Sequence, residues 1–181
     1  MAVKLGVLAD IQFADKDSIE RFGATLNYRG SRDALARAVA VLNAATDVAF
    51  VVQLGDFIDG FAGDEEKSKQ DLANINAVFS TITHKKMHVL GNHDLNVPRE
   101  HLHSELGLHD KAYFYEDVPN WRVVVLDTQQ VSVSWPEDTP NHREAATWLQ
   151  QNADKPNCKT WNGALGSTQL QWLEATLAGA A

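Results

Sequence analysis

Cysteine is almost absent from the sequence, because Cys158 stands alone. A single cysteine excludes an internal disulfide, and we therefore expect a reducing compartment, the cytoplasm. Cys158 lies in a polar, proline-containing stretch without a surrounding motif, so we interpret it as a structural residue and not as a catalytic thiol. Long apolar runs are absent as well, which predicts no membrane partner. The N-terminal segment MAVKLGVLAD is too short and becomes acidic too soon for a signal peptide, and it predicts a first strand instead.

Positive charge is also scarce. The 16 Lys and Arg residues are outnumbered by 24 Asp and Glu residues, and the formal net charge is −8. A general nucleic-acid binder needs a basic face, so this composition argues against nucleic acid as a partner. A phosphate substrate stays open, because acidic residues can hold cations that attract phosphate. The 181 residues, with 44% hydrophobic content and no repeat, predict one globular domain over residues 1–181.

Strand-like and helix-like segments alternate along the chain. Residues 4–8, 48–54 and 87–90 are short apolar runs typical of strands, and residues 113–115 and 121–126 predict a strand pair with a turn at Pro119-Asn120. Apolar residues at helical spacing predict a helix from Ser31 as N-cap, another over Leu72 to Ile82, a short one near Glu144 to Gln150, and a last one capped by Ser167. This alternation predicts a layered α/β fold.

Polar side chains follow the first three expected strands. Asp10 follows the first strand, Gly55-Asp56 the second and Gly91-Asn92-His93 the third. Ligands of α/β sheets gather at the carboxyl ends of the strands. A single Asp at a strand end is usually a turn former or a helix cap. Three such ends in succession, two of which open with Gly, favour a functional site.

The residue types at these strand ends indicate metal chemistry. Asp10, Gln12, Asp56 and Asn92 all carry oxygen donors, which suit hard divalent ions such as Mg²⁺ and Mn²⁺. A carboxylate such as that of Asp56 can bridge two ions, and two ions about 3.5–4 Å apart can clamp a phosphoryl group and activate a water. His93 could then protonate the leaving oxygen or stabilise the charged transition state.

Three motifs resemble the calcineurin-like metallophosphoesterase superfamily in their order and strand context: D-x-Q at Asp10–Gln12, G-D-x-x-D at Gly55–Asp59 and G-N-H-D at Gly91–Asp94. The resemblance implies a layered metallophosphoesterase sheet with flanking helices. Most of the superfamily has D-x-H in the first motif, and Gln12 is a mark of the manganese-dependent ADP-ribose/CDP-alcohol diphosphatase family. The stretches ADIQFAD, YRGS, GDFIDG, VVLDTQQVSV and NGALGSTQLQWL are similar to that family too, so the resemblance runs nearly end to end.

The resemblance implies a role for each of these side chains. Asp10, Gln12 and Asp56 would hold one metal ion, Asp56 and Asn92 would hold the second, and His93 would be the catalytic imidazole. The implied cofactors are two divalent ions, Mn²⁺ in the first place, with Mg²⁺, Zn²⁺ or iron as alternatives. The implied reaction is hydrolysis of a phosphoanhydride in a small nucleotide diphosphate, either ADP-ribose or a CDP-alcohol.

Other polar residues have weaker support. Arg29, in YRGS, is a candidate contact to a substrate phosphate, and a surface Arg that opens a helix is an equal alternative. His101 and His103 spell H-x-H, but they follow Pro98 in an expected helix start. Residues two apart on a helix do not face together, so we do not expect this pair to bind metal.

The superfamily pattern continues past the helix that matches Gln169 to Leu177. It adds a strand with a metal-binding His and then a Gly-His-x-His motif, which this sequence does not contain. By that pattern the first metal lacks one protein ligand, the second lacks two, and the fold lacks its C-terminal strands, which exposes a sheet edge. We therefore expect a C-terminally truncated domain with weaker metal binding. A fragment, a gene product cut short, and a natural short form that covers its edge by oligomerising all stay open.

Three functions follow from these observations. The first is a diphosphatase of ADP-ribose or CDP-alcohols with a two-metal mechanism. The second is a phosphodiesterase or monoesterase of the same superfamily with another substrate. The third is a truncated domain, catalytically weak or inactive, that serves as a binding module or is a fragment. Metal content and hydrolysis of ADP-ribose separate these alternatives.

Overall fold

The computed structural model describes residues 3–21 and 23–180. The chain divides into two compact units, Met1–Asp110 and Lys111–Ala181, called the first and second unit below. The expectation that residues 1–181 form one domain stays a prediction. Across the described ranges, no helix combines the length and the apolar content needed to cross a membrane.

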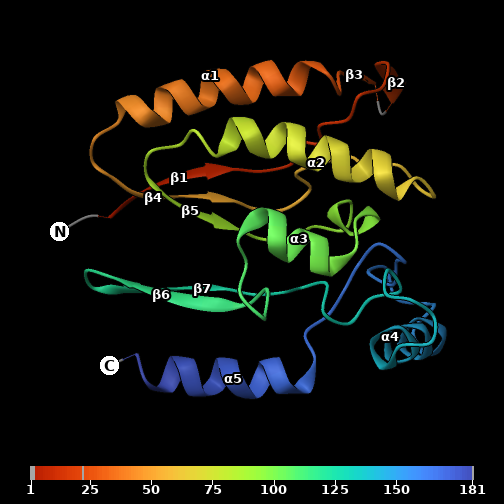
Figure 1. Ribbon diagram of the computed structural model, residues 1–181. Coiled ribbons are helices and arrows are strands. Elements are labelled where there is room, and N and C mark those ends of the chain that lie inside the picture. The colour runs from red at the N-terminus through yellow and green to blue at the C-terminus, as the bar shows by residue number, and fades with distance from the viewer. Residues whose placement is uncertain (1–2, 22, 181) are drawn as a thin grey trace. The chain divides into compact units, whose positions relative to one another are not determined.

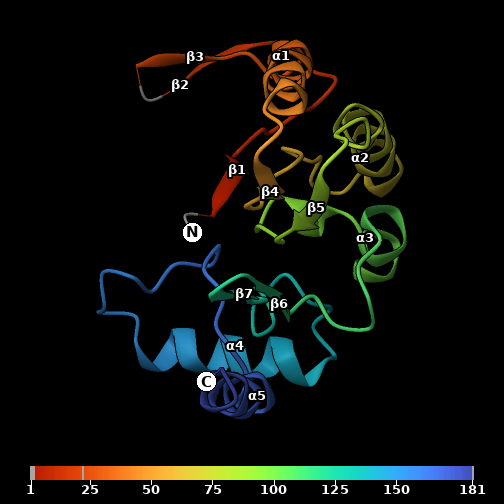
Figure 2. The same ribbon diagram turned by 90° about the vertical axis from the view of Figure 1, so that its left-hand side faces the viewer.

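The first unit is built on a three-stranded parallel sheet in the order β1-β4-β5 (Figures 1 and 2). The strands are β1 (Lys4–Leu8), β4 (Val48–Gln53) and β5 (Lys85–His88). The central strand β4 is the most buried, as its continuous apolar run predicts. Parallel neighbours require crossover connections, which helices α1 (Gly30–Ala44) and α2 (Glu65–Phe79) provide. The predicted α/β layers with flanking helices are confirmed.

Helices α1 and α2 lie side by side against the sheet (Figure 1), where Leu35, Leu72 and Phe79 join the core. A Cβ at Gly6 would lie 2.7 Å from Leu42 of α1, so this glycine lets the helix approach β1. Beside α2 lies α3 (Arg99–Leu106), and Asn76 Nδ2 donates to the Glu105 carbonyl at 2.9 Å. The remaining elements are a small hairpin, β2 (Ile19–Arg21) and β3 (Ala24–Leu26), and the 3₁₀ turn η1 (Asp94–Asn96).

The expected serine caps are wrong. Helix α1 begins at Gly30, one residue before Ser31, and its first N–H donates to Asn27 Oδ1 at 3.0 Å. The Ser31 hydroxyl instead donates to the Tyr28 carbonyl at 2.8 Å. Ser167 is likewise the first residue of α5, and the N-cap position belongs to Gly166. In both helices the serine lies inside the first turn, where its hydroxyl cannot accept from the next amides.

The second unit contains the predicted hairpin, β6 (Phe114–Val118) paired with β7 (Trp121–Val125). Helix α5 (Ser167–Ala178) runs along it (Figure 1), and the Arg122 guanidinium donates to the Thr176 carbonyl at 2.7 Å. The expected short helix near Glu144 to Gln150 is longer: α4 spans Pro140–Gln151. It begins earlier because Thr139 caps it and proline occupies its first position, where no N–H is needed.

A buried glutamine joins two of the stretches that carry the family resemblance, VVLDTQQVSV and NGALGSTQLQWL. Gln169 is fully buried, and its amide both accepts from Asp127 N at 2.9 Å and donates to Asp127 O at 3.1 Å. The same amide nitrogen donates to Gln130 Oε1 at 2.9 Å. These bonds satisfy buried polar groups, so the two stretches form a scaffold within the second unit.

His88, on β5, is a buried core residue. Its side chain is 6% exposed, and its ring centroid lies 5.6 Å from that of Phe57 and 4.7 Å from that of Phe79. Its Nδ1 atom has no hydrogen-bond partner among the described residues. Burial, together with the charge of Lys86, lowers the pKa of His88 from 6.5 to about 4. His88 is therefore a core residue of the first unit.

Acidification is expected to destabilise the fold through His88. The unfolded chain binds a proton below pH 6.5, whereas the folded chain resists protonation down to about pH 4. The neutral His88 ring therefore makes its full contribution to the free energy of unfolding above pH 6.5. This contribution is lost as the pH falls toward 4, by about 3 kcal/mol in total. Urea unfolding of the wild type and of His88→Leu from pH 7 to pH 4 measures this difference.

The matched control for this pH series is His109→Leu, because His109 is exposed. The control should lose stability with acidification as the wild type does, whereas His88→Leu should lose about 3 kcal/mol less. An identical pH dependence in His88→Leu and the wild type would show that His88 is not the titrating group.

Candidate functional site

The loops that follow the three parallel strands lie next to one another. The Asp10 N–H donates to the Gly55 carbonyl at 3.3 Å, and the Gln12 N–H donates to the Asp56 carbonyl at 2.9 Å. The His93 N–H donates to the Asp56 side chain at 3.0 Å. The sheet order β1-β4-β5 explains this arrangement, because neighbouring parallel strands end at the same edge.

The backbone of these loops is strained at the predicted ligands. Asp10, Gln12 and Asp56 have φ values of 50°, 46° and 51°, in the left-handed region. That conformation costs an L-residue about 1–2 kcal/mol, and non-glycine residues rarely adopt it. The loop-to-loop hydrogen bonds hold the three residues there. Strain of this kind clusters at functional sites, because the surrounding structure must be arranged to support it.

Asp56 is the centre of the arrangement. Its Oδ1 atom accepts the His93 N–H at 3.0 Å, and its Oδ2 atom accepts from Gln12 Nε2 at 3.3 Å. Each carboxylate oxygen has two lone pairs, so one bond to each oxygen leaves further acceptor capacity. The carboxylate of Asp56 therefore retains the donor capacity that a metal-bridging ligand needs.

Two glycines make room for Asp56. A Cβ at Gly91 would lie 2.1 Å from Asp56 Oδ1 and 2.3 Å from Asp56 N, which no side chain could tolerate. Gly55 has a φ of 99°, and a Cβ there would lie 2.8 Å from Gly91 N. The two glycines that open the predicted strand ends therefore allow the two loops to approach closely.

His93 is held by Asp59, to which the sequence-based assignment gave no role. His93 Nδ1 lies 2.8 Å from the Asp59 carbonyl oxygen and 3.4 Å from Asp59 Oδ1. A carbonyl oxygen can only accept, so the ring hydrogen resides on Nδ1. In the neutral ring, Nε2 is then the nitrogen without a hydrogen. The last residue of the G-D-x-x-D motif was the available signal for Asp59.

Asp94 is a second residue without a role in that assignment. It is 1% exposed, and its carboxylate accepts backbone N–H bonds from four residues, at 2.8–3.3 Å: Asp56, Phe57, Ile58 and Gly91. Burial raises the pKa of Asp94 to about 7, against the lowering effect of those hydrogen bonds. Asp94 thereby ties the loop after β4 to the loop after β5. Its place as the last residue of G-N-H-D was the available signal.

The other two predicted ligands, Asp10 and Asn92, lie in the loops that follow β1 and β5. Asp10 is exposed beside Gly55, and Asn92 is half-buried between Gly91 and His93. Among residues 3–21 and 23–180, no three His, Cys, Asp or Glu side chains gather as a metal-binding group. The predicted ligand set combines the amide oxygens of Gln12 and Asn92 with the carboxylates of Asp10 and Asp56, and it stays a prediction.

Arg29 lies at the N-cap position of α1 and is engaged with two carboxylates. Its Nε donates to Asp15 Oδ1 and its Nη1 donates to Asp17 Oδ1, both at 2.5 Å. These partners raise the pKa of the guanidinium, and Arg29 in turn lowers the pKa of Asp15. This geometry favours the surface Arg that opens a helix, and a phosphate contact by Arg29 stays a prediction.

The other reactive side chains of the sequence lie elsewhere. His101 and His103 are on α3, as expected, and His103 Nδ1 donates to the His109 carbonyl at 2.7 Å. The Cys158 thiol is half-buried and donates to the Leu149 carbonyl at 3.3 Å. That contact fits the structural role expected of this cysteine.

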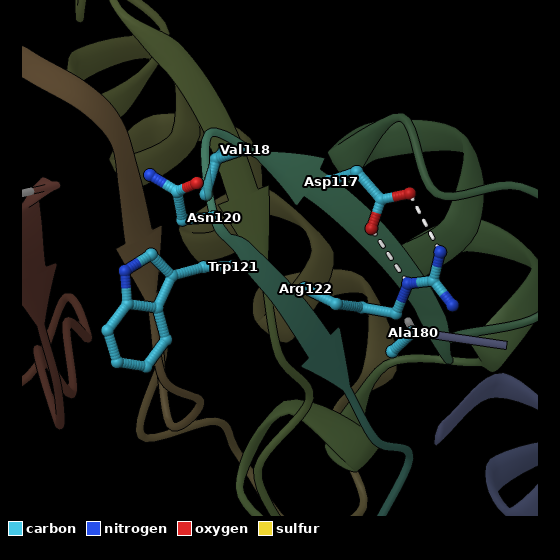
Figure 3. Close-up of a pocket in the computed structure, with 6 residues that line it drawn as sticks. All are labelled: Asp117, Val118, Asn120, Trp121, Arg122 and Ala180. Carbon is cyan, nitrogen blue, oxygen red and sulfur yellow. Dashed lines mark hydrogen bonds and ion pairs between the residues drawn. The ribbon is translucent and has the colours of Figure 1, made fainter. Parts of the chain in front are cut away.

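A pocket of about 440 Å³ lies in the second unit, and Figure 3 shows its lining. It is bounded by Asp117, Val118, Asn120, Trp121, Arg122 and Ala180. The charged groups are paired with each other, because Arg122 donates to both oxygens of Asp117, at 2.7 and 2.8 Å. None of the predicted site residues lines this pocket, and its paired charges offer no convergent set for a phosphate.

The chain is similar to known proteins over most of its length. The family model of the Calcineurin-like phosphoesterases matches residues 3–173. The chain is 35% identical to the manganese-dependent ADP-ribose/CDP-alcohol diphosphatase of Arabidopsis thaliana, over 95% of this chain and 61% of that protein. The rice enzyme of the same name is 34% identical, over 95% and 60%. The crystal structure of a dimetal phosphatase from Danio rerio superposes with a TM-score of 0.85 and 30% identity, covering 98% of this chain and 65% of that one.

Proposed function

Because the chain belongs to the calcineurin-like phosphoesterase family, we propose that it takes part in metal-dependent hydrolysis of a phosphoanhydride in ADP-ribose or a CDP-alcohol. The chain spans about three fifths of the length of the curated relatives it matches. The observation that carries the proposal is Asp56, whose two oxygens are bound by Gln12 and His93 from neighbouring strand ends. The relatives named above are diphosphatases of these substrates, which supports the same substrate class here.

The donor set fits a hard or borderline divalent ion such as Mn²⁺. Asp10, Gln12 and Asp56 would hold one ion, and Asp56 and Asn92 the other. The Gln12 amide nitrogen is already directed at Asp56, which makes its carbonyl oxygen the atom suited to a cation. When bound, a pair of divalent ions supplies charge for the phosphoryl oxygens and an activated water.

Side chains of the protein would orient the acid that acts on the substrate and hold it at a fixed distance from the metal ligands. His93 presents Nε2 to the substrate, because Nδ1 is committed to the Asp59 carbonyl. A doubly protonated His93 can then pass the Nε2 hydrogen to the oxygen of the leaving phosphate as the P–O bond breaks. Asp94 holds the loops of Asp56 and His93 together, so the acid and the metal ligands keep a fixed spacing.

Asp56→Asn tests the metal assignment directly. We expect the wild type to bind up to two Mn²⁺ ions per chain, and Asp56→Asn to bind them at least about tenfold more weakly. The reason is that the substitution removes the one carboxylate assigned to both ions. Titration followed by the electron paramagnetic resonance signal of free Mn²⁺ measures both the affinity and the stoichiometry.

Asp33→Asn is the matched control for the metal titration, since Asp33 is exposed in the first turn of α1. It should bind Mn²⁺ as the wild type does. Equal Mn²⁺ binding by Asp56→Asn and the wild type would remove Asp56 from the ligand set. Hydrolysis of ADP-ribose and CDP-choline, measured with Mn²⁺ on the same samples, tests the reaction itself.

A domain with weak or no activity is the second candidate. Two carboxylates and two amides make a weakly charged donor set, and no further His, Cys, Asp or Glu cluster supplements it within residues 3–21 and 23–180. Mn²⁺ binding without hydrolysis of any phosphoester would favour this alternative. Turnover of bis-p-nitrophenyl phosphate but not of ADP-ribose would instead favour a phosphodiesterase with another substrate.

The expected partner is a small nucleotide diphosphate. The acidic composition speaks against nucleic acid as a partner, since a phosphate backbone requires a basic face. Absence of a membrane partner, a cytoplasmic location and self-association through a sheet edge remain predictions. Analytical ultracentrifugation of the purified chain tests the last of these.

A further inference from the structure

Lys16 lies on the loop between β1 and β2, next to the site. Its ammonium is paired with Asp59 Oδ2. The side chains of Lys16 and Asp59 are 28% and 11% exposed, so the pair is largely screened from water. The Lys16 ammonium also lies over the Tyr28 ring, 4.2 Å from its centroid, and 5.4 Å from the centroid of the Phe61 ring. The electron-rich faces of these two rings attract the positively charged ammonium, and they would not attract a neutral group in the same way.

The loop that carries Lys16 is itself anchored. The neighbouring Asp15 N–H donates to the buried carboxylate of Asp71 at 3.1 Å, and Lys16 N donates to the Ala14 carbonyl at 2.9 Å. Tyr28, which supports the ammonium, is 5% exposed. Lys16 is therefore held at both its backbone and its charged end, unlike a mobile surface lysine.

Asp59 stands between Lys16 and the imidazole of His93. One carboxylate oxygen, Oδ2, pairs with Lys16, and the other, Oδ1, lies 3.4 Å from His93 Nδ1. The two oxygens of a carboxylate are fixed relative to each other, so a partner on one oxygen sets the direction of the second. Without the Lys16 ammonium, the Asp59 carboxylate is free to rotate away from the imidazole.

We propose that Lys16 is a positioning residue for His93, acting through the carboxylate of Asp59. The inference rests on the proposed function only in taking His93 as the imidazole that meets the substrate. The proposal is supported by three contacts: the ion pair of Lys16 with Asp59, the position of the Lys16 ammonium over the Tyr28 ring, and the 3.4 Å distance between Asp59 Oδ1 and His93 Nδ1. The side-chain contacts of Lys16 run to Asp59, Tyr28 and Phe61, which is why we assign it a positioning role and not a catalytic one.

The test compares Lys16→Met, which keeps the aliphatic stem against Tyr28 but removes the charge, with Lys16→Arg, which restores a cation. Lys69→Met is the matched control, because Lys69 pairs with Glu65 and Glu66 on α2 and has a similarly screened side chain. Circular dichroism and thermal unfolding confirm that each variant is folded. The structural readout is the ¹⁵N and ¹H signal of the His93 ring in the metal-free chain.

In Lys16→Met the signal of the hydrogen on His93 Nδ1 is expected to shift and broaden, and Lys16→Arg and Lys69→Met are expected to retain the wild-type signal. In hydrolysis assays with Mn²⁺, Lys16→Met should lower kcat about tenfold, as loss of an outer partner does. Its KM should stay within about twofold, because the change does not alter substrate binding. Lys16→Arg should recover most of the wild-type kcat.

The positioning role of Lys16 and the proposed function can be contradicted independently of each other. A folded Lys16→Met with a wild-type His93 signal would overturn the positioning role, whether or not the chain is active. A Lys16→Arg variant that behaves as Lys16→Met does would also overturn it, because the charge would then not be the cause. A wild-type chain that does not hydrolyse any substrate would contradict the proposed function, and the His93 signal would still decide the role of Lys16.

Discussion

Asp94→Ala is expected to lower the free energy of unfolding by about 3–5 kcal/mol, a large effect for a single substitution. The carboxylate of Asp94 accepts N–H bonds from four backbone positions in two loops. Alanine would leave those buried donors without a partner, and each unsatisfied donor is costly. The loops carrying Asp56 and His93 would also lose the side chain that joins them.

Urea unfolding followed by far-ultraviolet circular dichroism, which reports on the helices of the first unit, measures the effect of Asp94→Ala. Asp94→Asn adds a sharper comparison, because its amide keeps the shape but has one acceptor oxygen and turns an NH₂ group toward backbone donors. We expect it to destabilise the fold as well. Asp110→Ala, at an exposed position, should change stability by no more than about 0.5 kcal/mol. A loss of under 1 kcal/mol in Asp94→Ala would mean that water replaces the carboxylate without cost.

His93→Ala is expected to lower kcat for ADP-ribose hydrolysis by about 10²–10⁴-fold, the range for loss of a general acid. Metal binding should persist, because the group that holds Asp56 is the backbone N–H of residue 93 and the substitution keeps it. A lower kcat together with unchanged Mn²⁺ binding would show that the His93 imidazole acts in the reaction and is not a metal ligand. Steady-state kinetics with Mn²⁺ and a parallel Mn²⁺ titration provide the two measurements.

His101→Ala serves as the matched control for His93→Ala, because His101 lies on α3 and is likewise half-buried. It should retain the wild-type kcat. Unchanged hydrolysis in His93→Ala would assign the acid to another group. Loss of Mn²⁺ binding in the same variant would show instead that the imidazole ring is itself a ligand.

The strand ends were predictable from the sequence because their signals are local. The apolar run before Gly55 marks a buried strand, and the glycines at positions 55 and 91 mark the ends of two strands. The order of motifs then placed Asp10, Asp56 and Asn92 at one sheet edge, and the β1-β4-β5 order confirms that placement. The ligand and catalytic roles assigned to them stay predictions.

The supporting residues could not be assigned in the same way, because their roles depend on contacts between distant segments. Asp94 ends the G-N-H-D motif, but only the folded loops bring four N–H groups to its carboxylate. Lys16 and Asp59 are 43 residues apart, and no spacing rule links them. The expected serine caps failed for a smaller reason: the residue at the N-cap depends on the geometry of the preceding turn, and Arg29 and Gly166 occupy that position.

The left-handed backbone at Asp10, Gln12 and Asp56 has a consequence for how this site could be lost. Glycine relieves such a conformation, so substitutions to glycine at these positions carry a stability gain of up to about 1 kcal/mol from the backbone alone. A lineage freed from selection for hydrolysis would drift toward those replacements, because they improve folding while they remove donors. Each of the three positions thus combines an oxygen-bearing side chain with a backbone conformation that glycine would adopt at lower cost.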